Sequence, residues 1–172
     1  SEHNLRYGIH FMFSNHDDYL KNVFRENGSG VAVMYSSYVN MIQNTFDHNW
    51  GDASYGLLLK ELTSSRIIGN KFLQNTKGIF LEGTYRRFFS ENTFQNNGWA
   101  FRILGDCYGD SVLENNFFSN TFDVSTNAGE NENFFSKNYW DKYNGYDLDK
   151  DGVGDVPFHP VSLYSKLVEV VP

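Results

Sequence analysis

The sequence predicts an all-β protein, a right-handed parallel β-helix with coils of about 22 residues. Three observations predict it: a strand-like segment that recurs at a nearly fixed period, an Asn-x-Phe-x-x-Asn motif that recurs with it, and an aromatic content of 17%. Successive copies of the segment begin 22, 26, 22, 22 and 23 residues apart. Helical solenoids need longer repeats and an apolar spacing of three to four, which this chain lacks. The segments begin at Gly8, Gly30, Gly56, Gly78, Ala100 and Asp123.

The motif occupies a fixed place in each coil. An asparagine stands 14 or 15 residues after each start, and an aromatic residue follows two positions later. Asparagine tolerates the left-handed backbone that tight corners require, and stacked asparagines can hydrogen-bond from coil to coil. We therefore predict asparagines at the corners and an internal ladder of aromatic rings. The pairs are Asn22/Phe24, Asn44/Phe46, Asn70/Phe72, Asn92/Phe94, Asn115/Phe117 and Asn138/Trp140, and a second asparagine follows at Asn27, Asn49, Asn75, Asn97 and Asn120.

Alternation along the first strand of each coil predicts which side chains point inward. The columns one and three positions after each start are apolar and should form the core. They contain Ile9, Val31, Leu57, Ile79, Phe101 and Val124, and Phe11, Val33, Leu59, Leu81, Ile103 and Thr126. The columns between them should point outward. They contain His10, Ala32, Leu58, Phe80, Arg102 and Ser125, and Met12, Met34, Lys60, Glu82, Leu104 and Asn127.

The single long interval implies a four-residue insertion around residues 50–55, which should bulge from the side of the stack. Next to it, Leu58 and Phe80 leave an apolar strip on the outer face. Charged residues flank the strip, and such a rim often marks a partner surface. Alternatively, the insertion covers the strip. The charged residues are Lys60, Glu82 and Arg102.

A soft donor set is expected on the first two coils. Met12 and Met34 fall in one outward column, with His10 on the same face and His16 four residues after Met12, at the corner. Thioethers and imidazoles suit Cu(I), whereas magnesium and calcium prefer oxygen. We therefore regard these four residues as candidate copper ligands, against the alternative of ordinary surface variation.

An acidic loop follows the coils. We expect coils over residues 1–140 and an acidic loop with a cap or tail over residues 141–172. Alternating aspartates, a glycine and a main-chain carbonyl at the next position resemble the start of a calcium loop. Phe158 stands where an EF-hand has its bidentate Glu, and no helix flanks the loop, so a metal-free turn is the alternative. The candidate ligands are Asp147, Asp149, Asp151, Val153 and Asp155.

Composition restricts the partners. The formal net charge of −7 argues against nucleic acid. No apolar run is long enough to span a bilayer, and residues 161–172 should pack on the stack or on a partner. Cys107 is the single cysteine, so it forms no intrachain disulfide, and we expect it to be a small buried or loop residue.

Three stretches of the sequence resemble a known protein family. The stretches RYGIHFMFSNHDDYLKNVFRENGSGVAVMYS, SYGLLLKE and NYWDKYNGYDLDKDGVGDVPFHP closely resemble the C-terminal part of NosD proteins, and the resemblance covers nearly the whole chain. It implies a periplasmic, non-enzymatic accessory protein that works with an ABC transporter and a copper chaperone. Its role would be to deliver copper for the maturation of nitrous oxide reductase.

Two other functions remain open. Parallel β-helices often act on polysaccharides or bind carbohydrates. An enzyme of this kind needs paired carboxylates, or a base with cation-binding acids, on one groove-lining face. Glu82 has no carboxylate partner on the next coil, and the pairs Asp17/Asp18 and Asp106/Asp110 fall at expected corners. The third possibility is a purely structural adaptor between transporter and client, with no dependence on metal.

Overall fold

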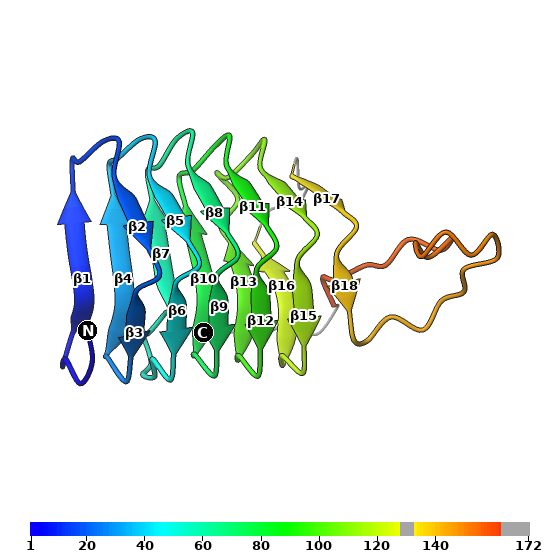
Figure 1. The fold of residues 1–172 in the computed structure, drawn as a ribbon, viewed down its shortest axis with the longest axis horizontal. Coiled ribbons are helices and arrows are strands. Elements are labelled where there is room, and N and C mark those ends of the chain that lie inside the picture. Colours follow the sequence, from blue (N-terminus) through cyan, green and yellow to red (C-terminus); the bar gives the residue numbers. More distant parts are fainter. Residues whose placement is uncertain (128–132, 163–172) are drawn as a thin grey trace.

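The computed structural model describes residues 1–127 and 133–162, and it confirms the parallel β-helix. Every strand in the described part of the chain belongs to one of three six-stranded parallel sheets that run along the stack (Figure 1). The first sheet contains β1 (Tyr7–Met12), β4 (Ser29–Met34), β7 (Leu57–Lys60), β10 (Lys77–Glu82), β13 (Trp99–Ile103) and β16 (Phe122–Thr126). The second contains β2 (Asp18–Leu20), β5 (Asn40–Ile42), β8 (Arg66–Ile68), β11 (Phe88–Ser90), β14 (Ser111–Leu113) and β17 (Phe134–Ser136). The third contains β3 (Val23–Arg25), β6 (Thr45–Asp47), β9 (Lys71–Leu73), β12 (Thr93–Gln95), β15 (Asn116–Phe118) and β18 (Tyr139–Trp140).

The register of the first sheet is the one that the repeat predicts. Ile9 pairs with Val31, and Val31 pairs with Leu57, so the first apolar column lies in line across the coils. A glycine starts most coils because the coils pack closely there. A Cβ on Gly30 would lie 2.3 Å from the carbonyl oxygen of Gly56.

The predicted aromatic ladder fills the interior behind the third sheet. Successive rings are stacked with centroids 5.3, 4.8, 4.9, 4.8 and 4.1 Å apart. Its five phenylalanines are almost completely buried. Stacked aromatic pairs add to the stabilisation from their buried area. The ladder consists of Phe24, Phe46, Phe72, Phe94, Phe117 and Trp140.

Two asparagine ladders connect the coils. In the middle of the first, Asn92 Oδ1 accepts hydrogen bonds from the backbone N–H and the side-chain Nδ2 of Asn70, at 2.9 and 3.0 Å. Asn92 Nδ2 in turn donates to the main-chain oxygen of Ile67 and to Asn115 Oδ1. The second ladder repeats this pattern from Asn27 through Asn49 onward. Buried polar groups need such partners, so the ladders also fix the register.

The asparagines do not adopt the left-handed backbone that we expected of them. The residue immediately before each ladder asparagine has positive φ instead, for example Gln43 at 55° and Glu91 at 57°. This arrangement follows from the ladder, because the asparagine must keep its amide directed along the stack while its neighbour turns the corner. The neighbour points outward, so many residue types are accepted there.

The insertion at residues 50–55 folds back onto the first sheet. Tyr55 is buried and packs with Ala32 and Leu58 in a small second cluster, against which Met34 and Phe80 also pack. Leu58 is therefore only 6% exposed, so the insertion covers this part of the strip, as in the second of the two alternatives. Ala32 and Ser125, expected on the outer surface, are completely buried, and the Tyr55 cluster covers Ala32.

The acidic segment lies beyond the last coil. β18 ends at Trp140, and the chain then extends away from the stack and returns to it (Figure 1). On its return, the ring of Phe158 lies 5.2 Å from that of Trp140, so it covers part of the end of the aromatic ladder. Most of the segment 161–172, predicted to pack on the stack or on a partner, lies outside the described residues.

Cys107 is buried, as expected, in a polar corner of the interior. Its Sγ lies 2.9 Å from Thr84 Oγ1, and burial raises the pKa of the thiol. Beside it, Arg87 and Asp110 form a fully buried ion pair. Burial raises the pKa of Asp110, although Arg87 opposes this shift. Thr84 and this ion pair surround Cys107, so we interpret it as a structural residue of the interior.

The first prediction concerns the middle of a ladder. We expect Asn92→Ala to lower the free energy of unfolding by about 2–3 kcal/mol, because the buried backbone N–H of Asn70 loses its acceptor and the bond from Asn70 Nδ2 along the ladder is lost. Asn22→Ala is the matched control, since Asn22 is exposed and donates to the ladder without accepting from a coil before it. Urea denaturation measures both, and equal losses would contradict the prediction.

A second prediction concerns the buried ion pair. Asp110→Ala leaves Arg87 charged in the interior, and we expect it to lower the free energy of unfolding by about 3–5 kcal/mol. The double variant Arg87→Met/Asp110→Asn keeps an acceptor for the backbone N–H of Arg87, which Asp110 Oδ1 now binds at 3.0 Å. It should recover most of the loss in urea denaturation. A double variant as unstable as Asp110→Ala would refute this explanation.

Candidate metal-binding site

The structure brings the two methionines of the predicted copper set together. Met12 at the end of β1 pairs with Met34 at the end of β4, so the two thioethers leave neighbouring coils side by side. Met12 is 39% exposed, whereas Met34 is half-buried against the Tyr55 cluster. The same column continues with Lys60 and Glu82, which form an ion pair.

His10 lies on the same face as the methionines. It is exposed on β1, two residues before Met12, and its ring centroid lies 4.9 Å from that of Tyr7. In the next coil its register partner is Ala32, which is too small to screen it. One imidazole and two thioethers therefore share this part of the first sheet.

His16 is placed differently. Its ring stacks on Tyr38 at 4.8 Å, and its backbone has a φ of 62°. It lines a cavity of about 370 Å³ with residues of the second sheet, among them Asp18 and Arg66. The contacts of His16 are therefore those of the second sheet, because the chain turns from one sheet to the next between Met12 and Asp18. The alternation of side chains along β1 could not predict this position of His16, because β1 ends where that turn begins.

The side chains of the outer strip below the methionines partly contact one another. The guanidinium of Arg102 lies 5.5 Å from the ring centroid of Phe80. Lys60 and Glu82 neutralise each other across adjacent coils. Phe80 and Arg102 remain half-buried, so part of the strip still faces solvent.

Three of the carboxylates considered for catalysis contact other side chains. Glu82 pairs with Lys60, and Asp110 is buried with Arg87. Asp18 accepts a hydrogen bond of 2.7 Å from Asn40 Nδ2. None of these three contacts joins two carboxylates, which is the arrangement that acid–base hydrolysis of a polysaccharide requires.

The acidic loop gathers oxygen atoms. Oxygens of Asp147, Asp149 and Asp151 all lie within 4.8 Å of one another, and the described residues contain no other such group of three histidine, cysteine or acidic side chains. Backbone N–H groups hold two of these aspartates, Gly152 donating to Asp147 at 3.0 Å and Val153 to Asp151 at 2.7 Å. Asp147 Oδ1 is enclosed without a hydrogen-bond partner in the described structure. Asp155 accepts a hydrogen bond from the N–H of Leu148.

Comparison with known proteins identifies the family. The family described as "Periplasmic copper-binding protein (NosD)" matches residues 1–145. The chain belongs to the NosD family. It is 25% identical over 138 residues to the "Probable ABC transporter binding protein NosD" of Pseudomonas aeruginosa, covering 70% of this chain and 32% of that protein. It is also 25% identical over 160 residues to the protein of the same name from Stutzerimonas stutzeri, covering 82% and 36%.

The chain thus spans about a third of the length of the curated NosD relatives that it matches. The family description supports copper and a periplasmic location in general terms, and the relatives' names refer to an ABC transporter. A search of the described residues finds no helix that is long and apolar enough to cross a membrane.

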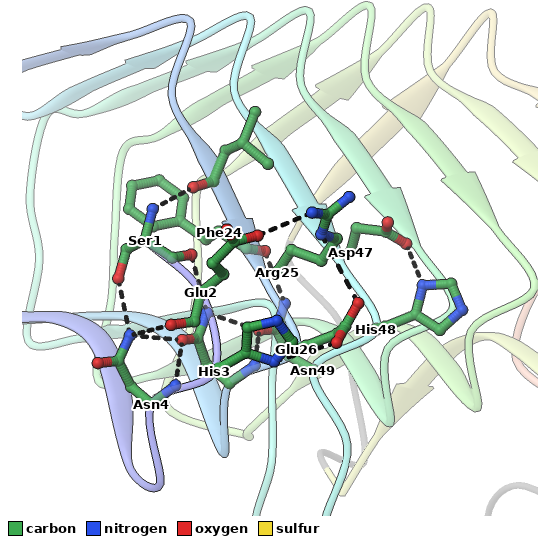
Figure 2. Close-up of polar contacts among 12 residues, drawn as sticks. Ser1, Glu2, His3, Asn4, Phe24, Arg25, Glu26, Asp47, His48 and Asn49 are labelled. Atoms are coloured by element: carbon green, nitrogen blue, oxygen red, sulfur yellow. Dashed lines mark hydrogen bonds and ion pairs between the residues drawn. The ribbon is translucent and has the colours of Figure 1, made fainter.

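One group of polar residues was missed at the level of sequence. His3, Glu26 and His48 lie at the corner that follows the strands of the third sheet, close to Glu2, Arg25 and Asp47 (Figure 2). Each stands directly before a ladder asparagine, at intervals of 23 and 22 residues. That repeat position was the available signal, because it places the three side chains on consecutive coils.

We propose that the acidic loop holds a hard cation such as calcium, and a third prediction tests it. Calcium should bind the protein in isothermal titration calorimetry, and Asp147→Asn/Asp149→Asn should abolish the binding because it removes two anionic ligands. Asp52→Asn, an exposed aspartate of the insertion, is the matched control. Binding unaltered in the double variant would show that the loop is a metal-free turn.

Proposed function

We propose that this chain is part of a periplasmic accessory protein that passes copper to the maturation of nitrous oxide reductase, without being an enzyme itself. The observation that carries the proposal is the pairing of Met12 with Met34 across the first two coils, with His10 on the same face. The family description as a periplasmic copper-binding protein supports it.

The donor set suits copper as a cargo. Two thioethers and an imidazole are soft to intermediate ligands, which favour Cu(I) over harder ions. Met12 and His10 are exposed, so a partner can reach the ion directly. Three protein ligands at a surface leave room for a ligand from a donor or acceptor protein. His16 contacts the second sheet, so we assign the site to His10, Met12 and Met34.

The partners follow from the same proposal. An ABC transporter is supported by the names of the relatives. A copper chaperone as donor and nitrous oxide reductase as acceptor belong to the proposed pathway. The half-buried Phe80, rimmed by Lys60, Glu82 and Arg102, is the proposed partner surface, without the buried Leu58.

Three of the carboxylates considered for catalysis already contact another side chain, which favours this function over polysaccharide hydrolysis. A purely structural adaptor differs from copper transfer in one respect that can be measured, because it requires no metal at the methionines.

The fourth prediction separates these two functions. Anaerobic Cu(I) titration against a competing chelator should give one ion per chain, and Met12→Leu/Met34→Leu should weaken binding at least tenfold. Leucine is the better substitute, because Met34 packs on the Tyr55 cluster and an alanine would leave a cavity there. Met41→Leu, a completely buried methionine, is the matched control and should bind like the wild type. If the double variant binds normally, the adaptor function is favoured.

A further inference from the structure

A second set of donor atoms lies at the corner after the third sheet. His3, Glu26 and His48 occupy the same position on three consecutive coils, because the backbone N–H of each donates to the coil that follows. The acceptors are the main-chain oxygens of Arg25, Asp47 and Leu73, at 3.3, 3.0 and 3.0 Å. Adjacent coils lie about 4.8 Å apart, so the two histidines stand about 10 Å apart with the glutamate between them.

The backbone directs all three side chains away from the core. His3, Glu26 and His48 have φ values of 58°, 53° and 52°, the corner conformation that recurs before each ladder asparagine. Their side chains are 67%, 47% and 44% exposed. The next two residues of this column, Gln74 and Asn96, are uncharged. Among the first five residues of this column, the ionisable ones are therefore these three.

The side chains already contact one another in pairs. His3 Nδ1 lies 3.1 Å from Glu26 Oε2, and His48 Nδ1 lies 2.6 Å from Asp47 Oδ1 (Figure 2). Asp47 at Nδ1 of His48 holds the proton there and leaves the Nε2 lone pair of His48 for another partner, as is usual for histidines that bind metals. His3 Nδ1 and Glu26 Oε2 lie instead at a separation that suits two ligands of one ion, with the proton of the neutral His3 ring on Nε2.

The surrounding charge favours a cation. Glu2, Glu26 and Asp47 supply three carboxylates, and Arg25 is the cationic side chain drawn beside them. Arg25 forms its closer contact with Glu2, at 2.7 Å, and lies 3.7 Å from Glu26. Glu26 thus keeps only the longer arginine contact, and Asp47 contacts His48.

We propose that His3, Glu26 and His48 form a site for a divalent transition-metal ion, separate from the methionine site. His3 and His48 supply imidazole nitrogens from the outer coils, and Glu26 supplies an oxygen from the middle coil. The imidazole of His48 faces Asp47 in this structure, so binding requires it to turn toward Glu26, which its exposure allows. Nitrogen and oxygen ligands without sulfur select ions such as Cu²⁺ or Zn²⁺ rather than Cu(I).

The fifth prediction tests this site with Cu²⁺ and Zn²⁺ as probes. The protein carries a short N-terminal extension in this experiment, because a free amino terminus two residues before a histidine chelates Cu²⁺ by itself. We expect one Zn²⁺ per chain at this site in competition with a chromophoric chelator. The electron paramagnetic resonance spectrum of bound Cu²⁺ should show coupling to two imidazole nitrogens.

Single substitutions decide the assignment. His3→Gln and His48→Gln should each weaken Zn²⁺ binding at least tenfold and leave one imidazole nitrogen in the Cu²⁺ spectrum. Glu26→Gln should also weaken binding. His159→Gln, which replaces an exposed histidine in the C-terminal segment, is the matched control and should have no effect. Wild-type affinity in either His3→Gln or His48→Gln would overturn the proposal, since the ion would not join the two coils. Cu(I) binding by the methionines is a separate measurement, so the two proposals can fail independently.

Discussion

The asparagine ladders are the constraint on which the rest of this protein depends. In the middle of a ladder, a buried asparagine accepts from the backbone and side chain of the preceding coil and donates to both neighbours, as Asn92 does. A shift of one residue would break these bonds and turn every interior side chain to the opposite face. The ladders therefore hold residues far apart in sequence, such as Met12 and Met34, side by side. Any ligand set on this surface is a consequence of that register.

Much of the architecture could be predicted because the repeat is so regular. Equal spacing gave the coils, alternation gave the core, and both together gave the pairing of Met12 with Met34. The errors arise where the chain leaves that regularity. Leu58 obeys the outward alternation, yet Tyr55 from the insertion covers it, and no local pattern encodes where an insertion folds. His16 follows Met12 closely in sequence but belongs to the next sheet, because a turn separates the two.

The corner residues illustrate a second limit of sequence reasoning. Asparagine was expected to take the left-handed conformation, for which it has an intrinsic tolerance. Its side-chain amide forms the hydrogen bonds of the ladder instead, which requires a different backbone conformation. The left-handed position passes to the residue before it, where hydrogen bonds from the backbone N–H to the next coil support glutamate, glutamine and histidine alike. This tolerance leaves the corner column free to carry ligands without disturbing the core. His3, Glu26 and His48 were missed because that column had not been assigned.

Two of the proposed sites, that of the methionines and that of the corner histidines, show how one scaffold can keep different metal chemistries apart. Both use the first coils, but the thioethers lie on a strand of the first sheet and the imidazoles and carboxylates at a corner after the third. A thioether pair favours Cu(I), whereas a set of nitrogen and oxygen atoms favours divalent ions. Because the ladders fix both columns, a side chain of one site cannot move to the other without breaking the register. Separation of ligand types by repeat position is therefore sufficient to separate the ions that they select.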